Sequence, residues 1–404
     1  MLLKISWKNI WRSKLRSFVV IGSIIVGVWA MIFGNGFMNG FVVSYMANAI
    51  NHDISHIQIH QPDFKKDQEV KYYIPNGHQK AEEISTWTGV KGATTRSLVT
   101  GMISSPRKAS GVQIRGIDPV NEAIVTELDS LIEEGEYFEG VRGISIVIGH
   151  KLAENLQVSV KSKVVLTFND ANGILTQTSC RVAGIIKSSG LSLSEGIVFI
   201  KQEDLGRLLG IGDNIHEIAV LLEPQVELSG IVDKYKSEYP QDLVESWKEI
   251  APQLAYLQEV YGSMLYVLMG IILVALVFGI VNTMLMAVLE RMKELGMLMA
   301  VGMTKIRVFM MIMIETLFLS IVGSPLGLLF GWLTISYYNK NGVDLTAYSE
   351  GLEAFGYESI LYPYVADNVY YIVTIGVFVT AFIGAVYPAL KAVRLRPVEA
   401  LHKI

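Results

Sequence analysis

The stretch Glu290–Lys305 reads ERMKELGMLMAVGMTK and lies between two long apolar segments of a chain of 404 residues. The charged residues of its first turn are costly to keep in a hydrocarbon core, and its composition favours a helix over a plain turn. An apolar, Met-rich face follows, formed by Leu295, Leu298, Met299, Val301 and Met303. Methionine side chains adapt to the surface that they meet, and Gly302 predicts a tight reversal into the apolar segment that follows. The stretch therefore predicts a short helix that docks onto a partner, with an ordinary amphipathic connector as the alternative.

The apolar residues gather in four segments, and each is long enough to span a membrane. Hydrophobic residues make up 51% of the chain and charged residues 18%, which departs from an ordinary soluble protein. Three of the segments contain no Asp, Glu, Lys or Arg, and the remaining one contains Glu315 alone. A helix of about 20 apolar residues crosses a hydrocarbon core. We therefore predict transmembrane helices at 17–43, 261–289, 308–336 and 368–390.

Basic residues predict the orientation of these helices. Residues 1–16 carry five Lys or Arg and no acid, the 290–307 loop carries four bases and two acids, and the 391–404 tail carries four bases and one acid. The 44–260 segment instead holds 20 bases and 29 acids, and 337–367 holds one base and five acids. Lys and Arg concentrate in cytoplasmic loops. We therefore expect both termini and the 290–307 loop in the cytoplasm, with the large segment outside.

The large external segment predicts an α+β domain. Runs of alternating, β-branched residues predict strands at Ile54–His60, Val112–Ile117, Lys163–Phe168, Ile174–Ile186, Ile197–Ile200 and Glu217–Leu222. Helical spacing occurs at Asn121–Glu134, Lys151–Leu156, Gln202–Leu209, Ile231–Tyr239 and, leading into the second span, Asp242–Tyr256. The predicted fold class is thus a membrane protein with one transmembrane α-helix before this domain and three after it. Trp7 and Trp11 further predict an amphipathic helix on the inner leaflet within residues 1–16.

Two motifs resemble the FtsX-like or MacB-like permease superfamily of ABC transporters. The first, E-R-x-x-E-x-G-x-L-x-A-x-G, is matched by Glu290, Arg291, Glu294, Gly296, Leu298, Ala300 and Gly302. The second, P-A-x-x-A-x-R-x-x-P-x-x-A-L, is matched by Pro388, Ala389, Ala392, Arg394, Pro397, Ala400 and Leu401. In that superfamily the first motif forms the coupling helix that sits in a groove of the ATPase. The resemblance implies the same role for the residues of the first motif here.

The resemblance also implies partners and a function. The chain would pair with a second permease, identical or homologous, and with a cytoplasmic ABC ATPase that binds the ATP and the Mg²⁺. The sequence Met38-Asn39-Gly40-Phe41 resembles the M-N-G-F of lipoprotein-releasing (Lol-type) permeases, which favours lipoprotein transport on the outer side of the membrane. Asn35, Met38, Asn39 and Phe41 are the candidate residues for cargo access from the lipid. A peptide or antibiotic efflux permease of the macrolide-exporter type and an FtsX-like regulator of cell-wall hydrolases are the alternatives.

Two further features of the third span have two interpretations each. Gly323, Gly327 and Gly331 form a ladder of small residues that lets another helix approach closely, either within the chain or in an assembly. Glu315 is costly within a span unless it is paired. It has either a role in coupling or a structural partner near the cytoplasmic end, where Lys305 and Arg307 lie.

The sequence favours neither catalysis nor a cofactor bound by this chain. It contains no Gly-Lys dipeptide and hence no Walker A loop for phosphate, and it contains no G-x-S-x-G or H-E-x-x-H motif. His52, His56 and His60 recur every four residues, as metal ligands on a helix would. The alternation of Ile57–His60 instead predicts a strand there, so we expect no metal site. We expect membrane lipid as a partner and no nucleic acid.

Overall fold

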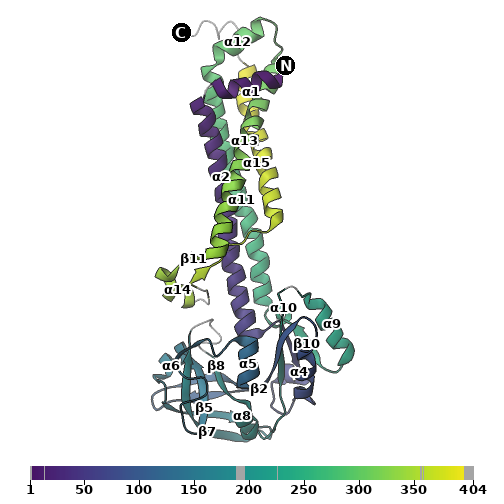
Figure 1. Cartoon of the computed structure of the whole chain (residues 1–404), viewed down its shortest axis with the longest axis vertical. Coiled ribbons are helices and arrows are strands. Elements are labelled where there is room, and N and C mark those ends of the chain that lie inside the picture. The colour runs from purple at the N-terminus through teal and green to yellow at the C-terminus, as the bar shows by residue number, and fades with distance from the viewer. Residues whose placement is uncertain are drawn as a thin grey trace. The chain divides into compact units, whose positions relative to one another are not determined.

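The computed structural model describes residues 2–12, 14–187, 196–224, 226–354, 357 and 359–394. The chain forms two compact units, which we call the membrane unit and the α/β unit. The membrane unit comprises Met1–Val42, Gln258–Val343 and Leu361–Ile404. The α/β unit comprises Val43–Leu257 and Asp344–Ile360. Figure 1 labels the elements of both units along the chain.

Four long apolar helices confirm the predicted transmembrane helices. Their bounds are α2 Lys14–Ala49, α11 Pro252–Glu290, α13 Lys305–Asn341 and α15 Asp367–Val393 (Figure 1). All four contain a window long and apolar enough to cross a membrane. Two shorter helices, α1 Leu2–Arg12 and α12 Met292–Ala300, complete the membrane unit. The long helices run past the predicted spans at both ends, because the amphipathic flanks continue the same helical backbone.

The glycine ladder of α13 packs against α2 of the same chain. A Cβ built on Gly327 would lie 2.7 Å from Cβ of Val28 and 3.0 Å from the carbonyl oxygen of Ile25. Gly323 and Gly331 face α2 in the same way, and all three glycines are buried. Side chains at these positions would push the two helices apart. The geometry therefore favours the intrachain interpretation of the ladder over a contact with a second permease.

We expect Gly327→Leu to destabilise the membrane unit by about 1–3 kcal/mol, because extra atoms in a packed interface force side chains off their rotamers. The measurement is the thermal unfolding midpoint of the purified full chain in detergent. Gly270→Leu in α11 is the matched control, since a Cβ at Gly270 would meet no atom within 4 Å. Equal midpoints for the two variants would refute the packing of α13 on α2.

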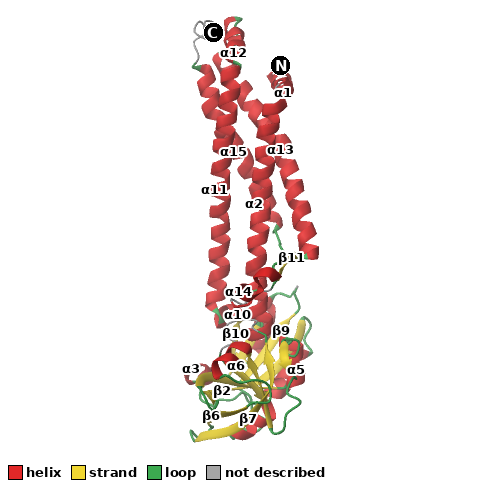
Figure 2. Cartoon of the chain, turned by 90° about the vertical axis from the view of Figure 1, so that its left-hand side faces the viewer, coloured by secondary structure: helices red, strands yellow, loops and turns green. Residues whose placement is uncertain are grey.

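A ten-stranded mixed sheet organises the α/β unit (Figure 2). The strands are β1 Ile57–His60, β2 Val90–Ser104, β3 Ala109–Ile117, β4 Ile132–Gly135, β5 Ile144–Gly149, β6 Lys163–Asn169, β7 Leu175–Ile186, β8 Ile197–Lys201, β9 Glu217–Leu222 and β10 Leu243–Ser246. Their order is β10-β1-β9-β2-β3-β8-β5-β7-β4, and β6 pairs with β2 and β7. The β3–β8 and β5–β7 pairs are parallel. This mixed sheet with helices confirms the predicted α+β class.

The helices of the α/β unit lie in the connections between the strands. They are the π-helix η1 Ile50–Ile54, α3 Pro62–Asp67, α4 Gly77–Ser85, α5 Pro119–Thr126, α6 His150–Leu156, α8 Gln202–Leu209, α9 Leu228–Glu238 and α10 Trp247–Ile250. The connection between α13 and α15 contains β11 Val343–Asp344, η2 Thr346–Tyr348, α14 Ser349–Ala354 and β12 Ile360–Leu361. Because η1 follows α2 directly and β1 begins at Ile57, the predicted strand Ile54–His60 starts three residues too early.

Two predicted helices of this unit are wrong in part. The helix predicted for Asn121–Glu134 ends at Thr126, because Glu127 takes a left-handed backbone conformation, and β4 follows. The helical spacing of Asp242–Tyr256 spans three elements, namely β10, α10 and the start of α11. Pro252 is the first residue of α11, a position that needs no backbone N–H. Chance periodicity across short elements produced the second error.

Candidate functional site

The helix α12 is placed by two breaks in the backbone, one on each side. Arg291 leaves the helical conformation between α11 and α12, with φ −98° and ψ 17°. After α12, Gly302 has φ 107°, a conformation that favours glycine because it has no Cβ. The N–H of Met303 donates to the carbonyl of Leu298, which closes the turn before α13. The predicted short helix and tight reversal at Gly302 are therefore both present.

Most of the Met-rich apolar face of α12 packs inward. Leu295 and Gly296 are buried, and Leu298, Met299 and Met303 pack against the core of the membrane unit. Only Val301 of the predicted docking face points outward, with 87% of it exposed, and it is joined by Met297 at 55%. Ile306 and Met310 at the start of α13 are exposed as well. The surface free for a partner therefore differs from the one that the spacing predicted, and Ala300 is part of it.

A polar cluster holds the charged end of α12 to α13. The guanidinium of Arg291 lies 3.3 Å from Glu294 and 3.3 Å from Glu315, which is buried in α13. Arg291 is a structural partner of Glu315 near this end of α13, whereas the side chains of Lys305 and Arg307 are exposed. An acid inside an apolar span is tolerated when it is paired. Arg291, Glu294 and Glu315 thus act within the chain as a latch between α12 and α13.

The N-terminal helix α1 is part of the same cluster. Asn9 Nδ2 donates to Glu315 at 2.6 Å, and Arg12 lies 2.8 Å from Glu294. The Ser6 hydroxyl donates to the carbonyl of Met311, and the Trp7 ring meets Phe318 edge-on at 5.5 Å between centroids. The exposed ion pair contributes about 0–1 kcal/mol, so the hydrogen bonds and ring packing hold α1. The sequence predicted a helix here, but Asn9 and Arg12 carried no signal of this role.

The candidate residues for cargo access lie where α2 meets the segment before α15. Asn39 Nδ2 donates to the carbonyl of Tyr364 at 3.0 Å, and the N–H of Tyr364 donates to the carbonyl of Gly36. Asn35 is buried, Met38 is half-buried, and Phe41 stacks edge-on with Phe37. A Cβ at Gly40 would lie 2.9 Å from the carbonyl oxygen of Tyr362. Some polar groups at this end of α2, namely the Asn39 amide and the Gly36 carbonyl, therefore already form hydrogen bonds within the chain.

The second family motif lies at the end of α15. Pro388 lies inside α15, which continues to Val393. Pro388, Ala389 and Ala392 are buried against the other helices. Arg394 closes the described part of the chain, while Pro397, Ala400 and Leu401 lie outside the described residues.

The three histidines after α2 do not meet at one point. His52 Nδ1 lies 2.7 Å from the carbonyl of Thr126, His56 Nδ1 accepts from the N–H of Leu222, and His60 Nε2 lies 3.1 Å from Glu217. Within the described residues, no group of three His, Cys, Asp or Glu has the geometry of a metal site. His60 lies on β1, as the alternation predicted.

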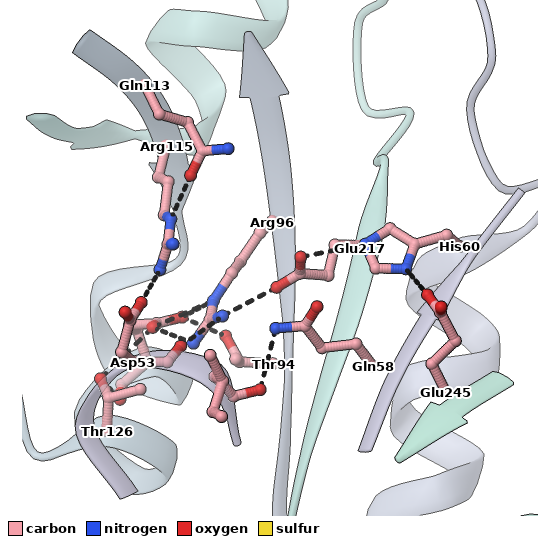
Figure 3. Close-up of polar contacts among 12 residues, drawn as sticks. Asp53, Gln58, His60, Thr94, Arg96, Gln113, Arg115, Thr126, Glu217 and Glu245 are labelled. Carbon is pink, nitrogen blue, oxygen red and sulfur yellow. Dashed lines mark hydrogen bonds and ion pairs between the residues drawn. The ribbon is translucent and has the colours of Figure 1, made fainter. Parts of the chain in front are cut away.

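A buried ion network around Arg96 crosses the sheet of the α/β unit (Figure 3). Arg96 of β2 is fully buried and lies 2.7 Å from Glu122 of α5 and 2.7 Å from Glu217 of β9. Its guanidinium also donates to the carbonyl of Asp53, whose carboxylate pairs with Arg115 of β3. The network therefore ties η1, which follows α2, to three strands and to α5.

The charges of this network depend on one another. Burial alone would lower the pKa of Arg96, but the carboxylates of Glu122 and Glu217 more than offset this and raise it. Burial alone would raise the pKa of Glu217, yet the hydrogen bond with His60 and the charge of Arg96 hold it well below its usual range. Arg96 and Glu217 are therefore both charged at neutral pH. Sequence reasoning missed this network, because Arg96 lies in a strand that the pattern did not reveal.

Two family models cover most of the chain. A model described as the MacB-like periplasmic core domain matches residues 17–237, which is more than half of the chain, and one described as the FtsX-like permease C-terminal matches residues 266–397. The chain belongs to the superfamily of FtsX-like and MacB-like permeases. This confirms the superfamily that the two motifs predicted, and the chain is an ABC transporter permease of the FtsX, MacB and Lol kind.

The relatives that the chain resembles include a lipoprotein-releasing protein, an uncharacterised ABC transporter permease and a macrolide exporter. The lipoprotein-releasing system transmembrane protein LolC of Haemophilus influenzae is 23% identical over 94% of this chain and 91% of its own length. An uncharacterised ABC transporter permease of Methanocaldococcus jannaschii is 25% identical over 67% of this chain and 65% of its own length. The macrolide export ATP-binding/permease protein MacB of Campylobacter jejuni is 29% identical over 31% of this chain and 17% of its own length.

Two solved structures match the part of the chain outside the membrane helices. The periplasmic region of MacB from Actinobacillus actinomycetemcomitans covers 52% of this chain and 97% of its own, at 12% identity and a TM-score of 0.36. The extracellular domain of the transporter YknZ covers 47% of this chain and 99% of its own, at 16% identity and a TM-score of 0.33.

Proposed function

We propose that the chain is the permease subunit of an ABC transporter that docks its ATPase through Met297, Val301 and the neighbouring exposed residues of α12 and α13. The observation that carries this proposal is that α12 is latched to α13 by Arg291 and Glu315 while two apolar side chains, Met297 of α12 and Val301 directly after it, stay exposed. Apolar groups exposed on a charged surface mark contact sites. A helix held in this way can transmit a movement of a bound partner to α11 and α13.

The proposal includes the orientation and the partners. The bases of residues 1–16 and of the 290–307 loop support a cytoplasmic position for α1 and α12, at the inner membrane of a bacterium. The α/β unit would then lie outside, where cargo is handled. The ATP and Mg²⁺ would be bound by the ATPase, and a second permease, identical or homologous, would complete the transporter.

The proposed cargo is a lipoprotein. Support comes from the M-N-G-F stretch at residues 38–41 and from the extent of the match to LolC, which runs over 94% of this chain. The match to MacB covers 31% of the chain, so an efflux permease of that kind is the second candidate.

Purification of the tagged full chain from native membranes in mild detergent tests the function. We expect an ABC ATPase in the eluate, together with lipoproteins that dissociate when ATP and Mg²⁺ are added, because the ATPase drives cargo release. Mass spectrometry of the eluate before and after ATP is the measurement, with a non-hydrolysable ATP analogue as the control. An ATPase accompanied by a periplasmic adaptor and no lipoprotein would favour efflux, and an eluate free of any ATPase would overturn the proposal.

A further inference from the structure

A groove between α13 and α15 opens on the surface of the membrane unit. Its volume is about 630 Å³. The residues that line it are Pro325, Leu328, Leu329 and Trp332 of α13 and Asp367, Tyr370, Tyr371 and Thr374 of α15. Neither the motifs nor the coupling cluster includes any of these residues. The groove therefore requires an explanation of its own.

The two ends of the groove differ in chemistry. Asp367 is the first residue of α15, with Tyr370 and Tyr371 one turn further along it, and Trp332 lies nine residues before the end of α13 at Asn341. Pro325 and Thr374 lie about two helical turns, or roughly 10 Å, deeper along their helices. The carboxylate of Asp367 and three aromatic rings thus lie at one end of the groove, which we call its mouth. Pro325, Leu328, Leu329 and Thr374 line the rest of it. This is the amphipathic order of a lipid at a membrane interface.

Asp367 is the one charged residue of the groove. No ion pair or hydrogen bond of its carboxylate occurs within the part of the chain that the structure describes. An acid in the first turn of α15 is favourable because it interacts with the helix dipole. The helix dipole does not explain why three aromatic rings lie beside this acid. Aromatic faces attract cations, and a carboxylate does the same. The mouth therefore suits an ammonium group.

We propose that this groove binds a phospholipid with a protonated amine headgroup, its ammonium at Asp367 and an acyl chain along Leu328 and Leu329. The residues 261–289, 308–336 and 368–390 contain no Lys or Arg. A second copy of the chain packed here through these apolar residues alone would leave Asp367 without a cation, whereas the amine lipid supplies one. A packing that also engaged Lys340 in the last turn of α13 would supply a cation, and the lipid content of dimers distinguishes the two occupants. The inference does not depend on the cargo or on the ATPase.

Native mass spectrometry of the full chain, released from nanodiscs, tests the proposal. The nanodiscs contain equal amounts of phosphatidylethanolamine and phosphatidylglycerol with the same acyl chains, and only the headgroup of the former carries an ammonium group. We expect the wild-type chain to retain phosphatidylethanolamine over phosphatidylglycerol by about fivefold, and Asp367→Asn to bring the ratio within twofold of one. Trp332→Leu keeps the carboxylate but removes a ring, and should give an intermediate ratio.

The control is Asp129→Asn, an exposed acid of the α/β unit, which should keep the wild-type ratio. A wild-type chain without headgroup preference would overturn the proposal, and so would an Asp367→Asn variant that keeps the preference. Dimers that retain no phosphatidylethanolamine would overturn it as well, since they would mean that a second copy covers the groove. The wild-type chain and the three variants should show the same unfolding midpoint, so that a lost preference reports on binding and not on folding.

Discussion

Replacing Arg96 by Met is expected to destabilise the centre of the α/β unit by about 3–5 kcal/mol. The guanidinium is fully buried and is the cation shared by Glu122 and Glu217. Methionine fills a similar volume but leaves two buried carboxylates without that cation, and such charges cannot regain water. Amide hydrogen exchange of β2 and β9 in the purified full chain measures this effect locally, which avoids assuming that both units unfold together.

The matched control for this prediction is Arg107→Met, because Arg107 is an exposed arginine at the turn after β2. It should change the exchange of the β2 and β9 amides by no more than about 0.5 kcal/mol. Arg96→Lys keeps the charge but makes fewer hydrogen bonds, so it should fall between the two. Protection in Arg96→Met equal to that in the control would mean that the buried network does not stabilise the sheet.

The membrane unit could be predicted from sequence because its signal is long and independent of context. Four apolar segments of more than 20 residues have few alternatives, and α2, α11, α13 and α15 all lie where those segments predicted them. The strands β6, β8 and β9 were also predicted to within one residue. Strong alternation and short turns make such strands visible to local reasoning.

The strand β2 could not be predicted, although it is the longest in the sheet. Its buried centre reads Thr94-Thr95-Arg96-Ser97, a polar run that neither alternates nor looks apolar. Those side chains are buried because their partners are distant in sequence, with Gln202 bonded to Thr95 and Glu217 bonded to Arg96. Local periodicity carries no information about such pairing, so both the strand and its ion network were missed.

The candidate coupling site was likewise predicted only in part. The motif of Glu290–Lys305 predicted the short helix and the reversal at Gly302, since both depend on local composition. It did not predict which face of α12 points outward, because that depends on how α12 packs against α13. The partners of Glu315 could not be predicted either, because Asn9 lies 306 residues away in sequence. The role of the motif residues in binding an ATPase stays a prediction.

Joint replacement of Met297 and Val301 by Asp is expected to weaken binding of the ATPase at least about tenfold, since each apolar side chain buried at a contact contributes about 1.5–3 kcal/mol. Both side chains are exposed, and neither belongs to the latch formed by Arg291, Glu294 and Glu315. The measurement is the amount of ATPase that co-purifies with equal amounts of permease. The double variant Met102→Asp and Val120→Asp is the matched control, because both residues are exposed in the α/β unit and carry the same two changes. Retained ATPase binding in the α12 variant would exclude this face as the docking surface, whereas loss in both variants would report a general defect of the chain.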